Sequence, residues 1–120
     1  MQLFREEFNN LDDLFWAEIS DLYDGEKRLT KMLAMANLVM TARLDQPGRK
    51  LVGVARCVTD FSWCCYLSEL AVSASAQRLG IGKGLLDAAR KQLGSEVSLI
   101  LLSVPGAEDF YRRIGMAHLP

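Results

Sequence analysis

Cysteine and histidine are scarce in this sequence, and its net charge is close to zero. Each of these features excludes classes of function. Three cysteines in 120 residues give an odd count, and the neighbours Cys64 and Cys65 would point to opposite faces of a strand. The cysteines form no CxxC motif, and together with the single histidine they do not have the spacing of a zinc site. We therefore expect no metal and no disulfide framework. The cysteines are expected to be small core residues in a reducing compartment, with the cytoplasm as the default.

The charge balance and the lengths of the apolar runs exclude further classes. Fourteen Lys and Arg against fifteen Asp and Glu give a net charge of −1, so neither nucleic acid nor an anionic membrane is an expected partner. No apolar run reaches the roughly 20 residues of a membrane span, and the opening MQLFREEF lacks the profile of a signal peptide. Half of the residues are hydrophobic, which suffices for a core. Residues 1–120 are therefore expected to form a single domain.

Hydrophobic spacing predicts an α/β or α+β fold with a mixed, mostly antiparallel sheet. Helices are expected over residues 11–22, 26–36, 80–93 and 107–114, and strands over 2–8, 38–44, 51–58, 64–72 and 97–104. The apolar strand 64–72, the helix 80–93 and the strand 97–104 form one strand–helix–strand unit. Such a unit is expected to be a right-handed parallel crossover, whereas the earlier strands form antiparallel hairpins.

Residues 76–86, AQRLGIGKGLL, place three glycines at alternate positions between a predicted strand and a predicted helix. Glycine stabilises neither element. It does let a ligand approach the unpaired N–H groups at a helix N-terminus, where anions such as phosphate bind. Arg78 and Lys83 add positive charge there. The spacing matches neither the P-loop nor the dinucleotide-binding GxGxxG motif, so the segment predicts an anion site of another kind.

The stretch Gln77-Arg78-Leu79-Gly80-Ile81-Gly82 resembles the Q/R-x-x-G-x-G/A signature of the GNAT superfamily, the acyl-CoA-dependent N-acyltransferases. Its surroundings resemble the family as well. YLSELAV is similar to the family's central strand, LVGVARCVTD to the preceding hairpin strand, and GAEDFYRRIGM to its A-x-x-F-Y-x-x-x-G-F segment. The order and spacing agree over roughly residues 37–118, with a shortened C-terminal end.

The resemblance implies acetyl-CoA as cosubstrate and assigns residues that bind it. Backbone N–H groups of residues 79–84 would bind the pyrophosphate with help from Arg78 and Lys83, and pantetheine would pair with strand 68–72. A backbone N–H near Val72 would stabilise the negative charge on the thioester oxygen. The family's pantetheine-binding Asn is replaced here by Val104, so the contact either passes to Ser103 or is absent. The full expected set is Leu70, Ala71, Val72, Gln77, Arg78, Leu79, Gly80, Ile81, Gly82, Lys83, Gly84 and Ser103.

The implied reaction is direct attack of a primary amine, on a small molecule or a peptide, in a ternary complex. Glu69 is the only carboxylate in an apolar strand, where partial burial would raise its pKa and suit a general base acting directly or through water. The structural alternative is an edge-facing or salt-bridged glutamate without a role in catalysis. Asp60, in the preceding turn, is the alternative base. Tyr111 matches the tyrosine that often protonates the CoA thiolate in the family; the alternative is a packing residue of a short helix. His118, close to the end, is expected not to be catalytic.

The sequence departs from the family pattern after Gly115, because two more strands usually follow and only residues 116–120 remain. Either the sheet stops early or another chain completes its edge, as in a homodimer. Two other functions stay open. One is a non-catalytic acyl-CoA-binding module or one half of a larger assembly, and the other is a generic nucleotide-phosphate binder.

Overall fold

The computed structural model describes residues 2–5 and 26–119. The helix expected over 11–22 lies outside these ranges, as do the last residues of the strand expected over 2–8. The described helices are α2 (Glu26–Met35), α3 (Ile81–Leu93) and α4 (Glu108–Arg113), with single 3₁₀ turns at Ala74–Ala76 (η2) and Pro105–Ala107 (η3). The strands are β1 (Gln2–Arg5), β2 (Leu38–Arg43), β3 (Leu51–Thr59), β4 (Cys64–Val72) and β5 (Ser98–Leu101).

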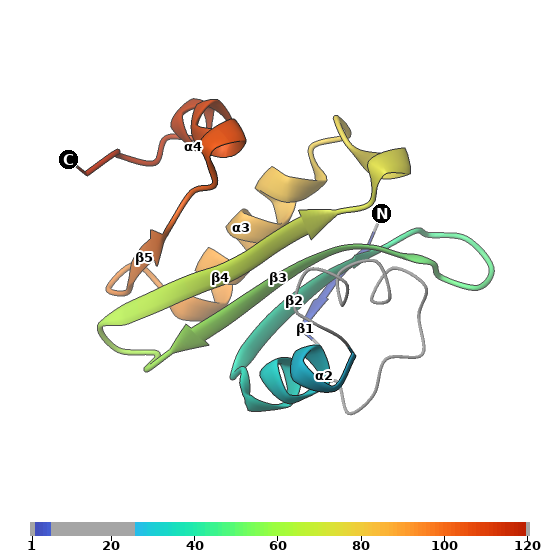
Figure 1. Ribbon diagram of the computed structural model, residues 1–120, viewed down its shortest axis with the longest axis horizontal. Coiled ribbons are helices and arrows are strands. Elements are labelled where there is room, and N and C mark those ends of the chain that lie inside the picture. Colours follow the sequence, from blue (N-terminus) through green and yellow to red (C-terminus); the bar gives the residue numbers. More distant parts are fainter. Residues whose placement is uncertain (1, 6–25, 120) are drawn as a thin grey trace.

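The strands form one sheet in the order β1-β2-β3-β4-β5. Neighbouring strands are antiparallel from β1 to β4, and β5 pairs with β4 in parallel. The connection from β4 to β5 runs through α3 (Figure 1). The predicted fold class, a mixed and mostly antiparallel sheet with one strand–helix–strand unit, is therefore confirmed.

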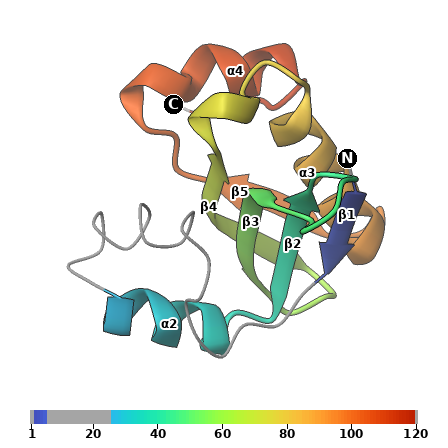
Figure 2. The same ribbon diagram turned by 90° about the vertical axis from the view of Figure 1, so that its right-hand side faces the viewer.

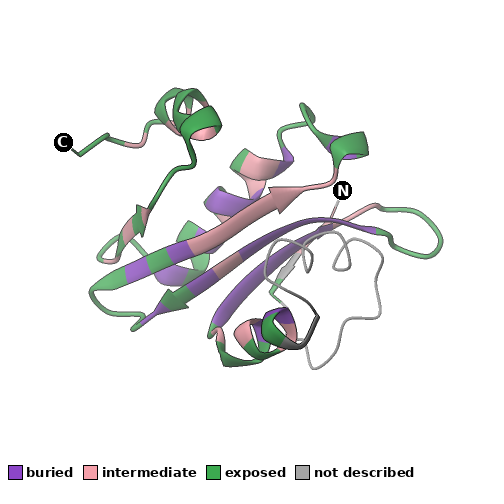
Figure 3. Cartoon of the chain, viewed as in Figure 1, coloured by how far each residue is buried: buried purple, intermediate pink, exposed green. Residues whose placement is uncertain are grey.

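Helices cover both faces of this sheet, because successive strand residues point to opposite sides. Figure 2 shows α2 and α3 on the two sides of the sheet. On β2, Met40 belongs to the larger core cluster with Leu85 of α3, whereas its neighbour Val39 packs with Leu29 and Leu33 of α2. The buried residues concentrate along β2, β3 and the inner side of α3 (Figure 3).

The cysteines follow this layering. Cys57 and Cys65 are buried in the cluster on the α3 side, as expected for small core residues. Cys64 is exposed, so the expectation holds for two of the three thiols. All three are free.

The two parallel strands separate after a short paired stretch. Pairing runs from Cys64 opposite Ser98 to Leu67 opposite Leu101 and then stops, although β4 continues to Val72. The strand predicted over 97–104 is therefore too long, because residues 102–104 have left β4 and pair with no other strand among the described residues. The result is a gap in the sheet between the second half of β4 and residues 102–104.

The β3–β4 turn is organised by one carboxylate. Asp60 Oδ1 accepts the backbone N–H groups of Ser62 at 2.9 Å, Trp63 at 2.7 Å and Cys64 at 3.1 Å. These hydrogen bonds, that of Trp63 foremost, lower the pKa of Asp60. The turn lies before the start of β4, at the opposite end of this strand from Val72. Asp60, the alternative base of the sequence, is thus engaged in the turn and lies away from the gap.

We expect Asp60→Asn to remove an acid-sensitive part of the stability. Because the folded pKa lies below the ordinary value of 3.8, the ionised carboxylate stabilises the fold above that pH, and its contribution is lost as the pH falls through the folded pKa. Urea titrations at several pH values would measure the free energy of unfolding. Wild type should lose stability more steeply than Asp60→Asn on acidification below about pH 4, and parallel curves would contradict this role.

Candidate active site

The loop that joins β4 to α3 holds two residues in the left-handed backbone region. Gly80, the N-cap of α3, has φ 76°, and Arg78 has φ 69°. Glycine adopts this conformation freely, whereas for a residue with a Cβ it costs about 1–2 kcal/mol. Gln77, Arg78, Leu79 and Gly80 are all exposed. Strain of this kind concentrates at ligand sites, so the exposed loop is a candidate for binding.

The N-terminus of α3 is open to an anion. Gly80 supplies no side-chain cap, and the first turn contains no acidic residue. The first N–H groups of a helix have no acceptor within it, and together with the helix dipole they attract negative charge. Lys83 lies exposed in the same turn and pairs with Asp87 at 2.8 Å. This helix end therefore suits an anionic group, and its role in binding the CoA pyrophosphate stays a prediction.

Gly82 has a packing role that its place in the motif did not reveal. A Cβ on Gly82 would meet Cζ of Phe110 at 3.1 Å, so the absent side chain lets α4 approach the first turn of α3. The sequence contains this phenylalanine in the pair Phe110-Tyr111, but only the folded chain shows that it lies next to Gly82.

The end of β4 directs one N–H group toward the gap. Ser73 N–H donates to the carbonyl of Val52 in β3 at 2.8 Å. Because successive N–H groups of a strand point to opposite sides, the N–H of Val72 points away from β3, toward the side where β5 has separated. The Gln77 side chain donates to the Val72 carbonyl at 3.3 Å and so ties the loop to the end of the strand.

The side chains next to Val72 point in different directions. Ala71 packs with the cluster under α2, and Leu70 and Val72 pack with the cluster under α3. These three residues therefore border the gap through their backbone.

Glu69 forms an ion pair with Arg56, which lies opposite it on β3. Its carboxylate accepts from Nε and, at 3.1 Å, from Nη2 of Arg56, and at 2.8 Å from the Ser68 hydroxyl. The two side chains are only 11% and 14% exposed. Of the two structural alternatives for Glu69, an edge-facing or a salt-bridged glutamate, the structure shows the salt-bridged one.

The sequence contained part of the signal for this pair, since Arg56 stands in the preceding strand. Its register with Glu69 depends on an irregularity between Arg56 and Cys57, which spacing alone does not reveal. The role of Glu69 as a base stays a prediction.

Tyr111 lies on the other side of the sheet from Glu69. It packs against the core cluster that contains α3, whereas Arg56, the partner of Glu69, also donates to the Met32 carbonyl of α2. Tyr111 is half-buried, and this burial raises the pKa of its phenol above the ordinary 10.0. The two predicted catalytic side chains thus lie on opposite faces of the sheet.

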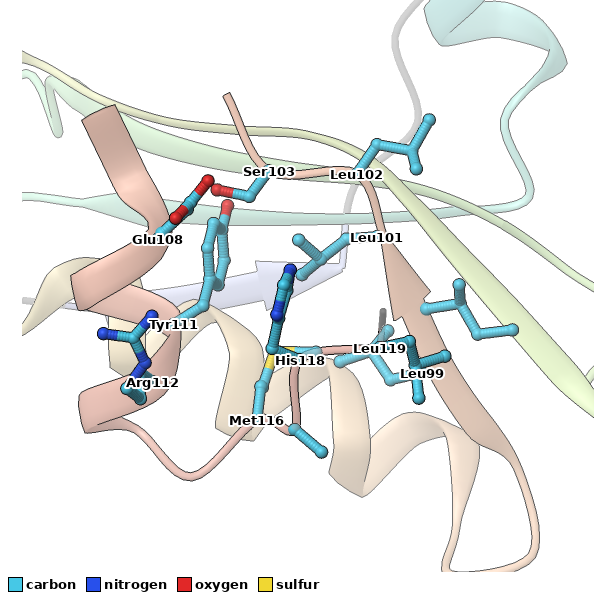
Figure 4. A pocket seen from close by; sticks show the side chains of 12 residues that line it. Leu99, Leu101, Leu102, Ser103, Glu108, Tyr111, Arg112, Met116, His118 and Leu119 are labelled. Carbon is cyan, nitrogen blue, oxygen red and sulfur yellow. The ribbon is translucent and has the colours of Figure 1, made fainter. Parts of the chain in front are cut away.

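A groove of about 520 Å³ lies beside β5 and contains Tyr111. Figure 4 shows the phenol pointing toward the side chains of Ser103 and Glu108. His118 lines the same groove, although sequence reasoning set it aside because it stands near the end. No spacing pattern could have found this placement, because the C-terminal residues return to β5 only in the folded chain.

Within the described ranges, no three His, Cys, Asp or Glu side chains come together as a group that could hold a metal ion. Among the helices of those same ranges, none is long and apolar enough to cross a membrane.

Comparison with known families identifies the class of protein. A sequence model of the acetyltransferase (GNAT) family matches residues 3–116. The chain therefore belongs to the GNAT acetyltransferase family, and the resemblance inferred from the motif is confirmed. None of the curated proteins compared with it matches the chain.

Solved structures share the fold. A GNAT family acetyltransferase from Streptococcus pneumoniae has 25% identity and a TM-score of 0.67, and the alignment covers 97% of this chain and 86% of that one. An aminoglycoside acetyltransferase from an uncultured soil metagenomic sample, in complex with sisomicin, has 22% identity and a TM-score of 0.71, with 99% and 90% covered. A protein from Deinococcus radiodurans has 23% identity and a TM-score of 0.69, and 80% of this chain spans 66% of its length.

We expect Arg56→Gln to lower the free energy of unfolding by about 2–3 kcal/mol, because it leaves a mostly buried carboxylate without its cation. Chemical denaturation would measure the change. Arg112→Gln is the matched control, since its pair with Asp109 is 64% and 84% exposed and should contribute less than about 0.5 kcal/mol. Equal effects of the two substitutions would contradict the structural role of the Arg56–Glu69 pair.

Proposed function

We propose that the chain is an N-acetyltransferase that transfers an acetyl group from acetyl-CoA to a primary amine, by direct attack in a ternary complex. The observation that carries this proposal is the strained, exposed loop at Arg78–Gly80, which opens onto the uncapped N-terminus of α3 beside the gap in the sheet. Membership of an acetyltransferase family supports the reaction class.

The loop and the first turn of α3 would hold the pyrophosphate of acetyl-CoA. Backbone N–H groups of residues 79–84 would donate to it, and the exposed Arg78 and Lys83 would add charge. The pantetheine arm would then lie along the free edge of β4 at Leu70, Ala71 and Val72. Ser103, on the far side of the gap, now donates to the Val104 carbonyl at 2.9 Å and would be a second polar contact.

Three groups of this chain would then act on the reaction. Acetyl-CoA supplies a thioester, whose carbonyl oxygen gains negative charge when the amine attacks. The Val72 N–H, directed toward the gap, would donate to that oxygen. Glu69, on the α2 side, would accept the amine proton through a water, since its carboxylate is already held by Arg56 and Ser68. Tyr111, on the α3 side, would donate its phenol proton to the departing thiolate.

The positions of these groups suit a reaction across the sheet. The proton acceptor and the proton donor lie on opposite faces, so an amine approaching from the α2 side and a cosubstrate bound on the α3 side would meet in the gap. The acceptor is proposed to be an amine of a small molecule or a peptide. The structural neighbour with bound sisomicin, an aminoglycoside acetyltransferase, is consistent with a small-molecule amine.

Two further parts of the proposal concern the setting of the reaction. Three free cysteines fit a reducing compartment and hence the cytoplasm. A second copy of the chain at the sheet edge is the proposed protein partner.

A second candidate function is a non-catalytic acyl-CoA-binding module. It is favoured by the Arg56–Glu69 pair, which occupies the carboxylate proposed as the base. Release of free thiol from acetyl-CoA in the presence of an amine panel separates the two functions, because a binding module would bind acetyl-CoA without consuming it.

We expect Arg78→Gly to weaken CoA binding about 5- to 10-fold, because a charged contact to phosphate contributes about 1 kcal/mol at an exposed site. The fold should keep its melting temperature, since relief of the left-handed strain offsets the flexibility that glycine adds to the unfolded chain. Titration calorimetry with CoA would measure the affinity.

Arg49→Gly is the matched control for Arg78→Gly. Arg49 also has a positive φ, of 44°, but it lies in the β2–β3 connection, away from α3. Its substitution should leave CoA affinity unchanged. Wild-type protein that is folded but binds no CoA would overturn the proposed function itself, whereas equal affinity of wild type and Arg78→Gly would remove only the role of Arg78.

We expect Tyr111→Phe to lower kcat about 10- to 100-fold with little change in CoA affinity, since the phenol acts on the thiolate only as it leaves. Because burial raises the pKa of Tyr111 above 10.0, this difference should persist up to about pH 10. Thiol release at several pH values would measure it. Tyr66→Phe, at an exposed tyrosine on β4, is the control. Unchanged turnover in Tyr111→Phe would exclude the tyrosine as the acid.

A further inference from the structure

Ser68 is the extra residue of a bulge in β4. Arg56 of β3 lies opposite Glu69 of β4, and the next residue along β3 lies opposite Leu67, so that Ser68 has no opposite residue on β3. On the other side of β4, pairing with β5 ends at Leu67. Ser68 therefore lies where the gap in the sheet begins. Bulges are frequent next to active sites, where they redirect a side chain.

The redirected hydroxyl joins the Arg56–Glu69 pair. Ser68 Oγ accepts a hydrogen bond from Arg56 Nη2 at 2.6 Å and donates its proton to Glu69 Oε1 at 2.8 Å. The same Nη2 also donates to Oε1, at 3.1 Å. The three side chains therefore form a closed ring of hydrogen bonds, and the contact of Arg56 with the Met32 carbonyl places this ring on the α2 side of the sheet.

The ring leaves an acceptor position open on the serine. A carboxylate oxygen has two lone pairs, and those of Glu69 Oε1 are engaged by Arg56 Nη2 and by the Ser68 hydroxyl. The Ser68 oxygen also has two lone pairs, and within the described part of the chain only Arg56 donates to it. Ser68 is half-buried. A molecule in the gap can therefore donate to Ser68 Oγ without displacing a partner, whereas at Oε1 it would have to displace one.

We propose that Ser68 is a proton relay between the acceptor amine and Glu69. The inference rests on the proposed function, in which a water carries the amine proton, and it places that water at the open lone pair of Ser68 Oγ. As the amine attacks, an N–H proton moves to the water, a proton of the water moves to Ser68 Oγ, and the serine's own proton moves to Glu69 Oε1. Water and serine end unchanged, and Glu69 holds the proton that the nitrogen lost.

The electron pairs balance with these proton transfers. The lone pair of the nitrogen forms the new C–N bond, and the pair of the broken N–H bond stays on the nitrogen. The pair of the C–S bond leaves with the sulfur, which takes the proton of Tyr111 as in the proposed function.

The distance along β4 suits a single water. Ser68 and Val72 are four residues apart, which is about 13 Å at about 3.3 Å per residue. In the proposed reaction the Val72 N–H donates to the thioester oxygen, so the attacking nitrogen lies near Val72 and too far from Ser68 for direct contact. A water with hydrogen bonds of about 2.8 Å on both sides closes the remaining distance.

Substitution of Ser68 tests the relay through the release of free thiol from acetyl-CoA. The acceptor is whichever of butylamine, sisomicin and a lysine peptide gives the fastest turnover with wild type. Ser68→Ala should lower kcat about 10- to 100-fold with CoA affinity nearly unchanged, and Ser68→Thr, which keeps a hydroxyl, should retain most of kcat. Ser98→Ala, at an exposed serine of β5, is the matched control and should leave kcat unchanged.

The pH dependence separates a relay from a purely structural effect. An amine with a pKa of about 10.4 is mostly protonated at neutral pH, whereas near pH 10 neutral amine and hydroxide are both more abundant. The deficit of Ser68→Ala relative to wild type should therefore shrink as the pH rises. The charged groups that face Ser68 from the described strands, Arg56 on β3 and Glu69 on β4, are the same in both proteins. A deficit that stays constant with pH would contradict the relay.

A water that contacts the carboxylate directly predicts the opposite result. Removal of the serine hydroxyl would open a lone pair of Glu69 Oε1 to that water, so Ser68→Ala would keep or gain activity. Such a result, or equal losses in Ser68→Ala and Ser68→Thr, would overturn the relay and leave the proposed acetyl transfer standing.

Two further outcomes complete the experiment. If Ser68→Ala does not fold, Ser68→Val is compared with Ser68→Thr, because valine and threonine differ only by a methyl group in place of the hydroxyl. Wild type that binds CoA but releases no thiol with any of the three amines overturns the proposed function, and the relay with it.

Discussion

The separation of β4 from β5 after Leu67 and Leu101 is the constraint on which the rest of the site depends. Two parallel strands that stayed paired would satisfy each other's backbone hydrogen bonds and leave no backbone donor or acceptor for a ligand. Because they part, the side of β4 that faces away from β3 borders a gap near Val72, and the Val72 N–H points into this gap. Residues 102–104 lead from the separated strand to α4, so the same divergence also places Tyr111 where it lies.

The two faces of the sheet then divide the chemical tasks. On the α3 side, the uncapped helix and the left-handed backbone at Arg78 and Gly80 offer positive potential and exposed N–H groups. On the α2 side, the Arg56–Glu69 pair provides a mostly buried carboxylate. A carboxylate with a cation beside it is a weaker base than an isolated one, and this is why a water between Glu69 and the amine fits the geometry better than direct contact.

β5 combines an apolar sequence with the last position in the order of the described strands. Burial decreases steadily across the sheet, from the fully buried residues of β2 and β3 to β5, where alternate residues are exposed and half-buried. An apolar strand is favourable in the middle of a sheet and hazardous at its edge. The residues of β5 have the composition of an interior strand, although β5 is the last strand of the sheet that the structure describes.

The sequence by itself determined the family, the fold class and most element bounds, because these follow from local patterns: hydrophobic spacing, the glycines of residues 80–84 and the FY pair. It also predicted that the strand over 64–72 would border the site. Only the tertiary structure decided that Arg56 pairs with Glu69, that Phe110 packs on Gly82, that His118 joins Tyr111 in one groove, and that β5 ends at Leu101. Each of these depends on strand register or on contacts between distant segments, and local sequence patterns contain no information about where such segments meet.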